Sequence, residues 1–594
     1  MLEKVGRFLL LAVIVVVCCN SCLTAGELLE KAAKFDRLVA EQHIPRGLVV
    51  NLQLIGEGEQ LRYRSAGDST IWTGAYIASQ VFRYRVSGEV TVLDNIEKCL
   101  QSFVQLHEMA GRQGFIGRVF GSREELGNGR DIVAGVGSHS HLCYKADTSR
   151  DQYTGVFMGC ALAWKHIRSD ALRKQVSFMI SAAANNLMNN NLALKANING
   201  QTQTFFNLNP DYAYQDRINP EEWAKVDDFP ANVFAKTVPY SERLARIISG
   251  FKPPAVRGGE ALRALLMLQT ACNISEDEQL TGYYKGELLG HRQLHLVASE
   301  TARLLEDIFI GRNLGVVEDK LNAVFVAAGR LLVQMTAMRI GMPESMAVWL
   351  EPVIDLPVIC KASQLTNRLM KTLAFLREPG SFRLFAVYAD RLEEQAKTLR
   401  MFKAERLAKK LENYAKRMRT FADSNLNEFS DTMRSYVGCN LGFFALLGIL
   451  EQPGDERLRS AALSILPRAF EPIADEGNSM YSFIEAAHTG RSYDDPLLVE
   501  ARKTLQLYPE DQTNRRFDHS NSLRHSLWPD RFGRHDRQSV ELIPINQRAP
   551  HIFIWQEPPR TLVTGADDQT RIAPVGYLLA YWYGRFHKLI KESD

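Results

Sequence analysis

The densest group of side chains that can carry out chemistry lies at residues 137–153, in the sequence GSHSHLCYKADTSRDQY. A loop is expected to lead here into a helix, with Asp147 and Asp151 close to its first turn. Carboxylates in such places often only accept the free amide hydrogens and complement the helix dipole. Alternatively, Asp151 supplies a carboxylate to a cleft, as acid, base or hydroxyl acceptor, while Arg150 binds an anionic group through two hydrogen bonds. The sequence leaves both interpretations open.

Two aromatic side chains could extend such a site. Trp72 and Tyr76 lie one turn apart in an expected helix, and aromatic rings can stack on a flat apolar ligand face such as that of a sugar ring. The same spacing is equally typical of side chains in a packed core. They are therefore candidates for substrate binding beside Arg150.

Histidine spacing gives little support for a metal. His139-x-His141 and His291-x-x-x-His295 have ligand-like spacing, but the second pair lacks the glutamate of the H-E-x-x-H zinc motif. The G-x-G at 135–137 has no third glycine, and neither G-x-S-x-G nor a P-loop is found. We therefore predict no metal and no cofactor, and we set aside nucleotide binding and serine-hydrolase chemistry.

Most of the chain is expected to be helical, because apolar residues recur at spacings of three and four. Strands and helices do not alternate along the chain, as they would in a protein with a parallel sheet. A plain α-solenoid is the structural alternative, but no self-similar repeat of fixed period is visible. The helices pair into about six successive hairpins, which predicts an all-α fold, an (α/α)6-type toroid. The expected helical ranges are 72–87, 91–110, 152–168, 170–193, 258–273, 284–310, 317–340, 362–377, 382–422, 426–451, 455–470, 479–489, 494–507 and 575–591.

Minor β segments are expected near both ends of the chain. Two β-prone runs separated by Gly-Glu-Gly-Glu predict a hairpin or a short extended segment within 47–65, and HIFIWQ at 551–556 predicts an extended segment. The stretch at about 194–255 is long and rich in aromatics, which argues for an ordered insertion into a toroid domain of residues 26–508. Residues 509–594 are predicted to form a C-terminal tail that packs back onto the toroid.

The first 25 residues are typical of an export signal. Lys4 and Arg7 precede an apolar run from Phe8 to Val17, which is too short to span a bilayer comfortably. Leu23-Thr24-Ala25 offers a cleavage site, whereas Asn20-Ser21-Cys22 loosely resembles a lipobox, so a lipid tether at Cys22 is the alternative. We expect an exported protein that is periplasmic, anchored to the outer membrane or extracellular.

Composition is that of a folded globular protein, with 46% hydrophobic and 23% charged residues. The formal net charge of +3 does not indicate a basic surface for binding nucleic acid. The densest basic stretch, 397–419, is interleaved with glutamates and apolar residues, as expected for the solvated face of an amphipathic helix. The six cysteines after residue 25 are widely scattered, which predicts buried thiols rather than a disulfide scaffold. The sequence does not predict an oligomeric state.

Several segments resemble, in order and spacing, the hairpins of the six-hairpin glycosidase-like, α/α-toroid superfamily. They are WTGAYIASQVFRYRVSG (72–88), HEMAGRQGFIGRVF (107–120), YKADTSRDQYTGVFMG (144–159), NLGFFALLGILEQPGDERL (440–458) and NSMYSFIEAAHTG (478–490). Members of this superfamily include glycoside hydrolases, polysaccharide lyases and sugar epimerases, so the resemblance implies carbohydrate chemistry by analogy. No single family's catalytic signature can be matched residue by residue.

The chain contains the residue types that glycoside hydrolysis requires and also those that a lyase or epimerase requires. Glycoside hydrolysis needs two carboxyl groups, and Asp147 or Asp151 could work with Glu108 or Glu485. A lyase or epimerase needs a His or Tyr base beside a positive group. The candidate catalytic residues are therefore Asp151, Asp147, His139 and Tyr153, and the candidate substrate-binding residues are Trp72, Tyr76, Arg112, His141 and Arg150.

The sequence thus predicts an exported protein that binds or processes an oligosaccharide or polysaccharide, either as a glycoside hydrolase or as a polysaccharide lyase. The alternative is a non-catalytic envelope or surface lipoprotein that uses the toroid as a binding scaffold. An enzyme should bring carboxylates or a His or Tyr base together in a pocket, whereas a scaffold should have that pocket filled by apolar side chains or by its own tail.

Overall fold

The computed structural model describes residues 26–210, 254–299, 436–521 and 541–594, with breaks at 56–59, 65, 130, 199–200 and 540, and the isolated residues 400, 409, 412 and 539. Across these ranges the chain is mostly helical with few strands, which agrees with the all-α prediction. The signal segment, most of the predicted insertion and the helices predicted between 300 and 435 lie outside the described residues.

The described helices follow the predicted periodicity closely. Helices α3 and α4 begin and end within three residues of the predicted ranges, and α20, α21 and α22 do so as well. Helix α2 was not predicted. The bounds are α2 Glu27–Leu38, α3 Ser69–Ser87, α4 Thr91–Ala110, α5 Arg123–Leu126, α6 Arg150–Ala163, α7 Asp170–Asn189, α11 Pro254–Ile274, α12 Glu278–Gly282 (continued by the wider turns of η6, Tyr283–His291), α19 Tyr436–Leu450, α20 Glu456–Phe470, α21 Ser479–Thr489, α22 Pro496–Gln506 and α23 Val575–Phe586.

The described strands form small antiparallel sheets. Of the two alternatives predicted near the N-terminus, the hairpin is present as β1 and β2, with Asn51 opposite Arg64 and Ile55 opposite Gln60. A three-stranded sheet, in the order β3-β5-β4, fills the connection between α4 and α6, and β6 pairs with β7 after α7. The bounds are β1 Asn51–Ile55, β2 Gln60–Arg64, β3 Phe120–Gly121, β4 Ile132–Ala134, β5 Cys143–Lys145, β6 Ala193–Ile198, β7 Gln201–Asn207, β8 Phe517–Asp518 and β9 Val563–Thr564.

Helix α3 lies at the centre of the described structure, and residues 69–82 are all buried. Its closest neighbour is α6, which approaches through glycines rather than through interdigitated side chains. A Cβ atom at Gly74 would overlap the carbonyl oxygen of Gly155, and one at Gly155 would overlap the backbone of Ile71. The two backbones are therefore in direct contact, which only glycine permits.

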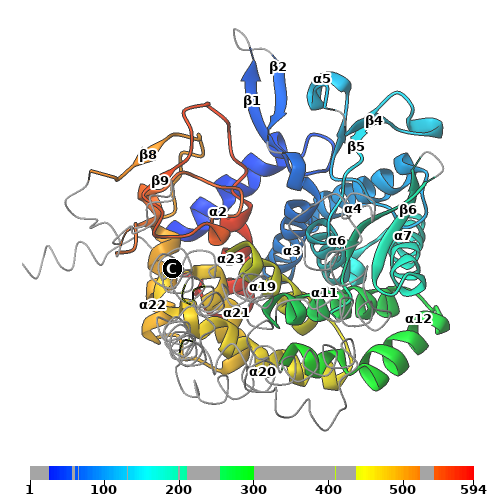
Figure 1. Ribbon diagram of the computed structural model, residues 1–594. Coiled ribbons are helices and arrows are strands. Elements are labelled where there is room, and N and C mark those ends of the chain that lie inside the picture. Colours follow the sequence, from blue (N-terminus) through cyan, green and yellow to red (C-terminus); the bar gives the residue numbers. More distant parts are fainter. Residues whose placement is uncertain are drawn as a thin grey trace, which may run out of the picture.

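Helices α3, α6, α11, α19, α21 and α23 form one series of neighbours (Figure 1). Contacts run from α3 to α6, from α6 to α11 and α19, from α19 to α21, from α21 to α23, and from α23 back to α3. Gly448 of α19 lies beside Leu266 of α11 and Met158 of α6. Helices α4, α7, α20 and α22 each pack against members of this series.

The two ends of the described chain meet. Helix α2 packs against α23 (blue and red in Figure 1), and the backbone of Leu52 pairs with that of Arg571 through N···O distances of 3.0 and 2.7 Å. The amide nitrogen of Gly26 donates to the carbonyl oxygen of Asp594 at 3.1 Å. The C-terminal residues are thus joined to the N-terminal elements by hydrogen bonds as well as by packing.

The predicted extended segment at 551–556 is wrong. Ile554–Gln556 forms a single 3-10 turn, and the consecutive side chains Phe553, Ile554 and Trp555 are all buried. A strand would point alternate side chains to opposite faces, so it could not bury all three against one surface. Among the described helices, none combines the length and the apolar character that crossing a membrane requires.

Candidate functional site

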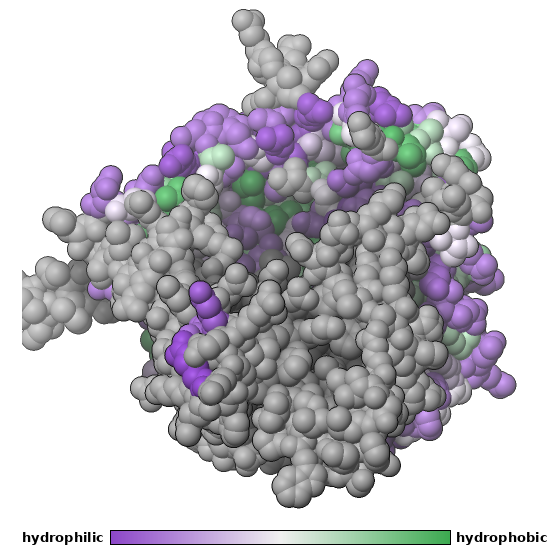
Figure 2. All heavy atoms as spheres, viewed as in Figure 1, coloured by the Kyte–Doolittle hydropathy of each residue, from purple (hydrophilic) through white to green (hydrophobic). Residues whose placement is uncertain are grey.

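Polar side chains gather at the end where α3, α6 and α11 begin. The Thr70 hydroxyl donates to Gln152 Oε1 at 2.5 Å, and Gln152 Nε2 donates to Asp68 Oδ1 at 2.8 Å, which joins the starts of α3 and α6. Figure 2 shows the molecule hollowed in the upper part of this view, where hydrophilic and hydrophobic side chains are both visible. Helix starts also carry unpaired amide hydrogens, so this end suits polar ligands.

Two arginines and two carboxylates meet between the first turn of α6 and the second and third turns of α11. Arg150 donates to Glu260 Oε1, and its Nε lies 3.6 Å from Asp151 Oδ1. Arg263 Nη1 lies 3.5 Å from Glu260 Oε2 and 3.9 Å from Asp151 Oδ1. We call these four residues the charged cluster.

The charged cluster is largely removed from water. The Glu260 side chain is 0% exposed and that of Arg263 is 7% exposed, whereas Asp151 remains 31% exposed. Within the described part of the chain, Asp151 Oδ1 and Arg263 Nε are buried atoms without a hydrogen-bond partner. Buried polar atoms left unpaired cost free energy, so this cluster is poorly explained as a purely stabilising element.

Trp72 lies in the first turn of α3, beneath the C-terminal segment. Its ring stacks on Phe553 with centroids 5.4 Å apart, and it meets Phe444 and His551 edge-on, each at 6.4 Å. Only 4% of Trp72 is exposed. The face that could receive a sugar ring is therefore covered by the protein's own C-terminal segment.

Asp147 lies near the start of α6 but outside the charged cluster. Its carboxylate pairs with Arg118 Nη2 at 3.2 Å, and Arg118 also donates to Asp68 Oδ1 at 3.1 Å and to the carbonyl of Gly67 at 2.7 Å. Half of the Asp147 side chain is exposed. Asp147 and Asp151 thus pair with different arginines, although they are four residues apart in the sequence.

Tyr153 is a buried residue that stabilises the fold rather than an exposed base. Its hydroxyl donates to the carbonyl of Gly114 at 2.6 Å and accepts from the amide of Ile116 at 2.9 Å. Its side chain is 0% exposed, and burial raises the pKa of the hydroxyl far above its ordinary value. These bonds hold the strand-bearing segment after α4 against α6.

We expect Tyr153→Phe to lower the free energy of unfolding by about 2 kcal/mol, because it leaves a buried carbonyl and a buried amide without partners. Urea unfolding followed by circular dichroism measures this. Tyr84→Phe is the matched control, since no hydrogen bond to that half-buried hydroxyl is found among the described residues. Equal stability of the two variants would contradict the structural role of Tyr153.

The remaining predicted residues are dispersed. Tyr76 is fully buried two turns into α3, and its hydroxyl has no hydrogen-bond partner in the described structure. His139 Nε2 lies 3.2 Å from Glu108 Oε2, and His141 contacts the carbonyl of Ser138, both on the loop after β4. The Arg112 guanidinium lies 5.7 Å from the centroid of the Phe115 ring. No contact joins any of them to the charged cluster in the described structure.

Glu260 and Arg263 were not predicted from the sequence as site residues, and neither were Asp68, Gln152 and Arg118. Glu260 and Arg263 are three residues apart in an apolar helix, which is an unusual place for two charges and was the available signal. Among the described residues, no group of three or more His, Cys, Asp and Glu side chains is arranged to hold a metal ion.

Comparisons of this chain with models of protein families, with curated proteins and with solved structures find no match in any of the three.

Proposed function

We propose that this chain is an exported α/α-toroid protein that binds and processes a glycan at the end where its inner helices begin. The toroid is supported by the series of helix neighbours that leads from α3 back to α3. In this arrangement the described helices α3, α6, α11, α19, α21 and α23 belong to the inner layer, and α4, α7, α20 and α22 belong to the outer layer.

The observation that carries the functional proposal is the charged cluster. Taking carboxylates and guanidinium groups out of water costs several kcal/mol for each ion unless pairing and hydrogen bonds offset it, and within the described structure Asp151 Oδ1 and Arg263 Nε are buried without a hydrogen bond. Such a cluster at the end where a layer of helices begins is expected where charge must act on a substrate.

The roles within the cluster follow from exposure and pairing. Asp151 is the most accessible carboxylate of the four residues, so it is the proposed acid or base. Arg150 and Arg263 hold Asp151 and the buried Glu260 in place and neutralise their charge. Asp151 supplies one of the two carboxyl groups that glycoside hydrolysis requires, whereas Glu260, being fully buried, only positions the arginines beside it. The sequence-predicted partners Glu108 and Glu485 lie outside the cluster, paired with His139 and Arg491.

Export and tethering remain part of the proposal. The basic n-region, the short apolar run and the lipobox-like Asn20-Ser21-Cys22 support a periplasmic, outer-membrane-anchored or extracellular location. All of these residues lie outside the described structure.

We expect Asp151→Asn to reduce glycan processing by at least about a hundredfold, because general acid–base catalysis contributes roughly that much. The purified protein is incubated with neutral and uronate-containing oligosaccharides, and products are identified by mass spectrometry. Asp170→Asn is the matched control, since Asp170 is also an acid in the first turn of a helix but is 89% exposed at the surface of α7.

If Asp151→Asn and the parent protein form products at the same rate, the catalytic residues lie outside the charged cluster. Absence of both products and binding across neutral and acidic glycans would contradict the glycan proposal as a whole.

The second candidate is a non-catalytic envelope or surface lipoprotein that uses the same scaffold for binding. It is favoured by the burial of Trp72 beneath Phe553, because a core covered by the chain's own C-terminal segment is what a scaffold requires. Glycan binding that is retained by Asp151→Asn, with no product from either form, would favour this candidate.

A further inference from the structure

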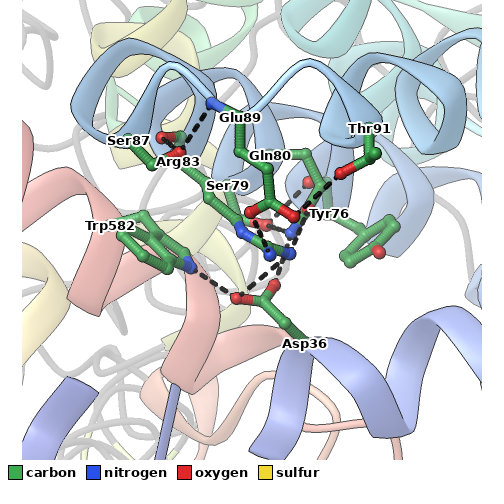
Figure 3. Close-up of polar contacts among 9 residues, drawn as sticks. All are labelled: Asp36, Tyr76, Ser79, Gln80, Arg83, Ser87, Glu89, Thr91 and Trp582. Atoms are coloured by element: carbon green, nitrogen blue, oxygen red, sulfur yellow. Dashed lines mark hydrogen bonds and ion pairs between the residues drawn. The ribbon is translucent and has the colours of Figure 1, made fainter. Parts of the chain in front are cut away.

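A buried carboxylate links the first and last described helices to α3, away from the charged cluster. Asp36 of α2 is 2% exposed. Its Oδ1 accepts from Gln80 Nε2 of α3 at 2.7 Å, and its Oδ2 accepts from Trp582 Nε1 of α23 at 2.9 Å. Figure 3 shows the carboxylate between these two side chains, with Arg83 close by. One side chain thus joins three helices that lie far apart in the sequence.

The positive charge near Asp36 is shared with a second carboxylate. Arg83 Nη1 lies 3.5 Å from Asp36 Oδ2, while its Nη2 lies only 2.7 Å from Glu89 Oε2 at the surface. Glu89 also accepts from the Thr91 hydroxyl at 2.8 Å, which fixes it at the start of α4 (Figure 3). Asp36 therefore has the longer, less direct contact with the one guanidinium that faces it among the described residues.

We propose that Asp36, Gln80, Arg83 and Trp582 form a pH-responsive clasp, which holds α2 and α23 against α3 more tightly in acid than at neutral pH. The titratable and charged groups that face Asp36 in the described structure are Arg83 and Tyr76 from α3, Tyr581 from α23 and Glu89 from the turn after α3. Burial raises the pKa values of both tyrosines, so they stay neutral across this pH range.

The direction of the response follows from the cost of burying the ionised carboxylate. Burial raises the pKa of Asp36 from 3.8 to about 6, against the opposing effects of Arg83, Gln80 and Trp582. A carboxyl whose pKa is higher in the folded chain stabilises the closed clasp fully below pH 3.8 and loses that contribution as the pH rises through about 6. A pKa shift of about two units corresponds to an about hundredfold change in the equilibrium constant between the state in which α2 and α23 are packed on α3 and the state in which they are detached.

The test is hydrogen–deuterium exchange of α2 in the purified protein at pH 4.5 and pH 7.5, corrected for intrinsic exchange and compared with α6. We expect protection of α2 to fall by tenfold to about a hundredfold between the two pH values, relative to α6. Asp36→Asn should remove this pH dependence, because the amide does not titrate.

Glu89→Gln is the second variant, and it keeps the buried contacts intact because Glu89 is 46% exposed. The substitution removes the second carboxylate that pairs with Arg83, so the guanidinium interacts with Asp36 alone and lowers the pKa of Asp36. The pH response of α2 should therefore become smaller and move to lower pH. Glu30→Gln, on the exposed face of the same helix, should behave as the parent protein.

An α2 whose protection does not change with pH in the parent protein would overturn the clasp. The same holds if Glu89→Gln responds to pH as the parent does, even where Asp36→Asn fails to fold. These exchange measurements use no glycan, so their results are independent of the proposed function.

Discussion

Gly155→Ala is expected to destabilise the protein by about 3 kcal/mol or more, because the new methyl group has no space between α6 and α3. The atoms that it would meet are the backbone of Ile71, which cannot swing away as a flexible side chain could. Gly74 faces Gly155 across the same contact, so Gly74→Ala should have a similar effect. Thermal and urea unfolding of the purified variants measure this.

Gly442→Ala is the matched control, since Gly442 also lies in a helix, α19, but a Cβ atom there meets nothing within 4 Å. Alanine should leave stability unchanged or raise it by up to about 1 kcal/mol through its better helix propensity. A Gly155→Ala protein as stable as Gly442→Ala would mean that α3 and α6 do not pack backbone to backbone.

A second large effect is expected at the opposite end of the helices. Glu451 follows α19 and is 7% exposed. Its Oε1 lies 2.8 Å from His587 Nε2 and 3.4 Å from His488 Nε2, and it accepts from the Tyr583 hydroxyl at 3.1 Å. This carboxylate therefore joins the C-terminal ends of α19, α21 and α23.

Glu451→Gln is expected to lower the free energy of unfolding at pH 7 by about 3 kcal/mol. Burial opposes ionisation of Glu451, but hydrogen bonds from His488 and His587 outweigh it and lower the pKa to about 2. A carboxyl with a lowered pKa contributes its full stabilisation above its unfolded value of 4.5 and loses it as the pH falls toward 2. The stability difference between parent and variant should therefore shrink below pH 4.5.

Urea unfolding at pH 7 and pH 3 gives that difference directly. Glu510→Gln is the control, because Glu510 is 57% exposed and its ion pair with Lys34 should contribute less than about 1 kcal/mol. A constant stability difference across this pH range would show that the Glu451 carboxylate is not what stabilises the three helix ends.

Local patterns were enough to predict most described helices and the β segments near the N-terminus. Helices bury one stripe of side chains at intervals of three and four, so α4 and α20 are visible in the sequence before any partner is known. The Gly-Glu-Gly-Glu segment likewise indicated β structure at β1 and β2, but it left open whether the two runs pair as a hairpin or form a short extended segment. The burial of 551–556 in a turn was not predictable, because a short apolar run fits several conformations until its packing partner is known.

The candidate site was predicted only in part. The sequence located Arg150 and Asp151 at the start of a helix, which is where a local motif can be recognised. It did not find Glu260, because the ion pair with Arg150 spans 110 residues and leaves no periodic trace. It also placed Tyr76 and Tyr153 among the site residues, since residue type alone does not distinguish an internal tyrosine from an exposed one.

The sequence by itself therefore determined the helical character of the chain, the positions of most described helices and the first turn that carries Asp151. These depend on interactions between residues a few positions apart, which the order of side chains specifies directly. Tertiary structure alone decided which charges meet at the charged cluster, which ring covers Trp72 and which helices share Asp36. Those contacts exist only after distant segments pack, because burial and the loss of water set their partners and their pKa values.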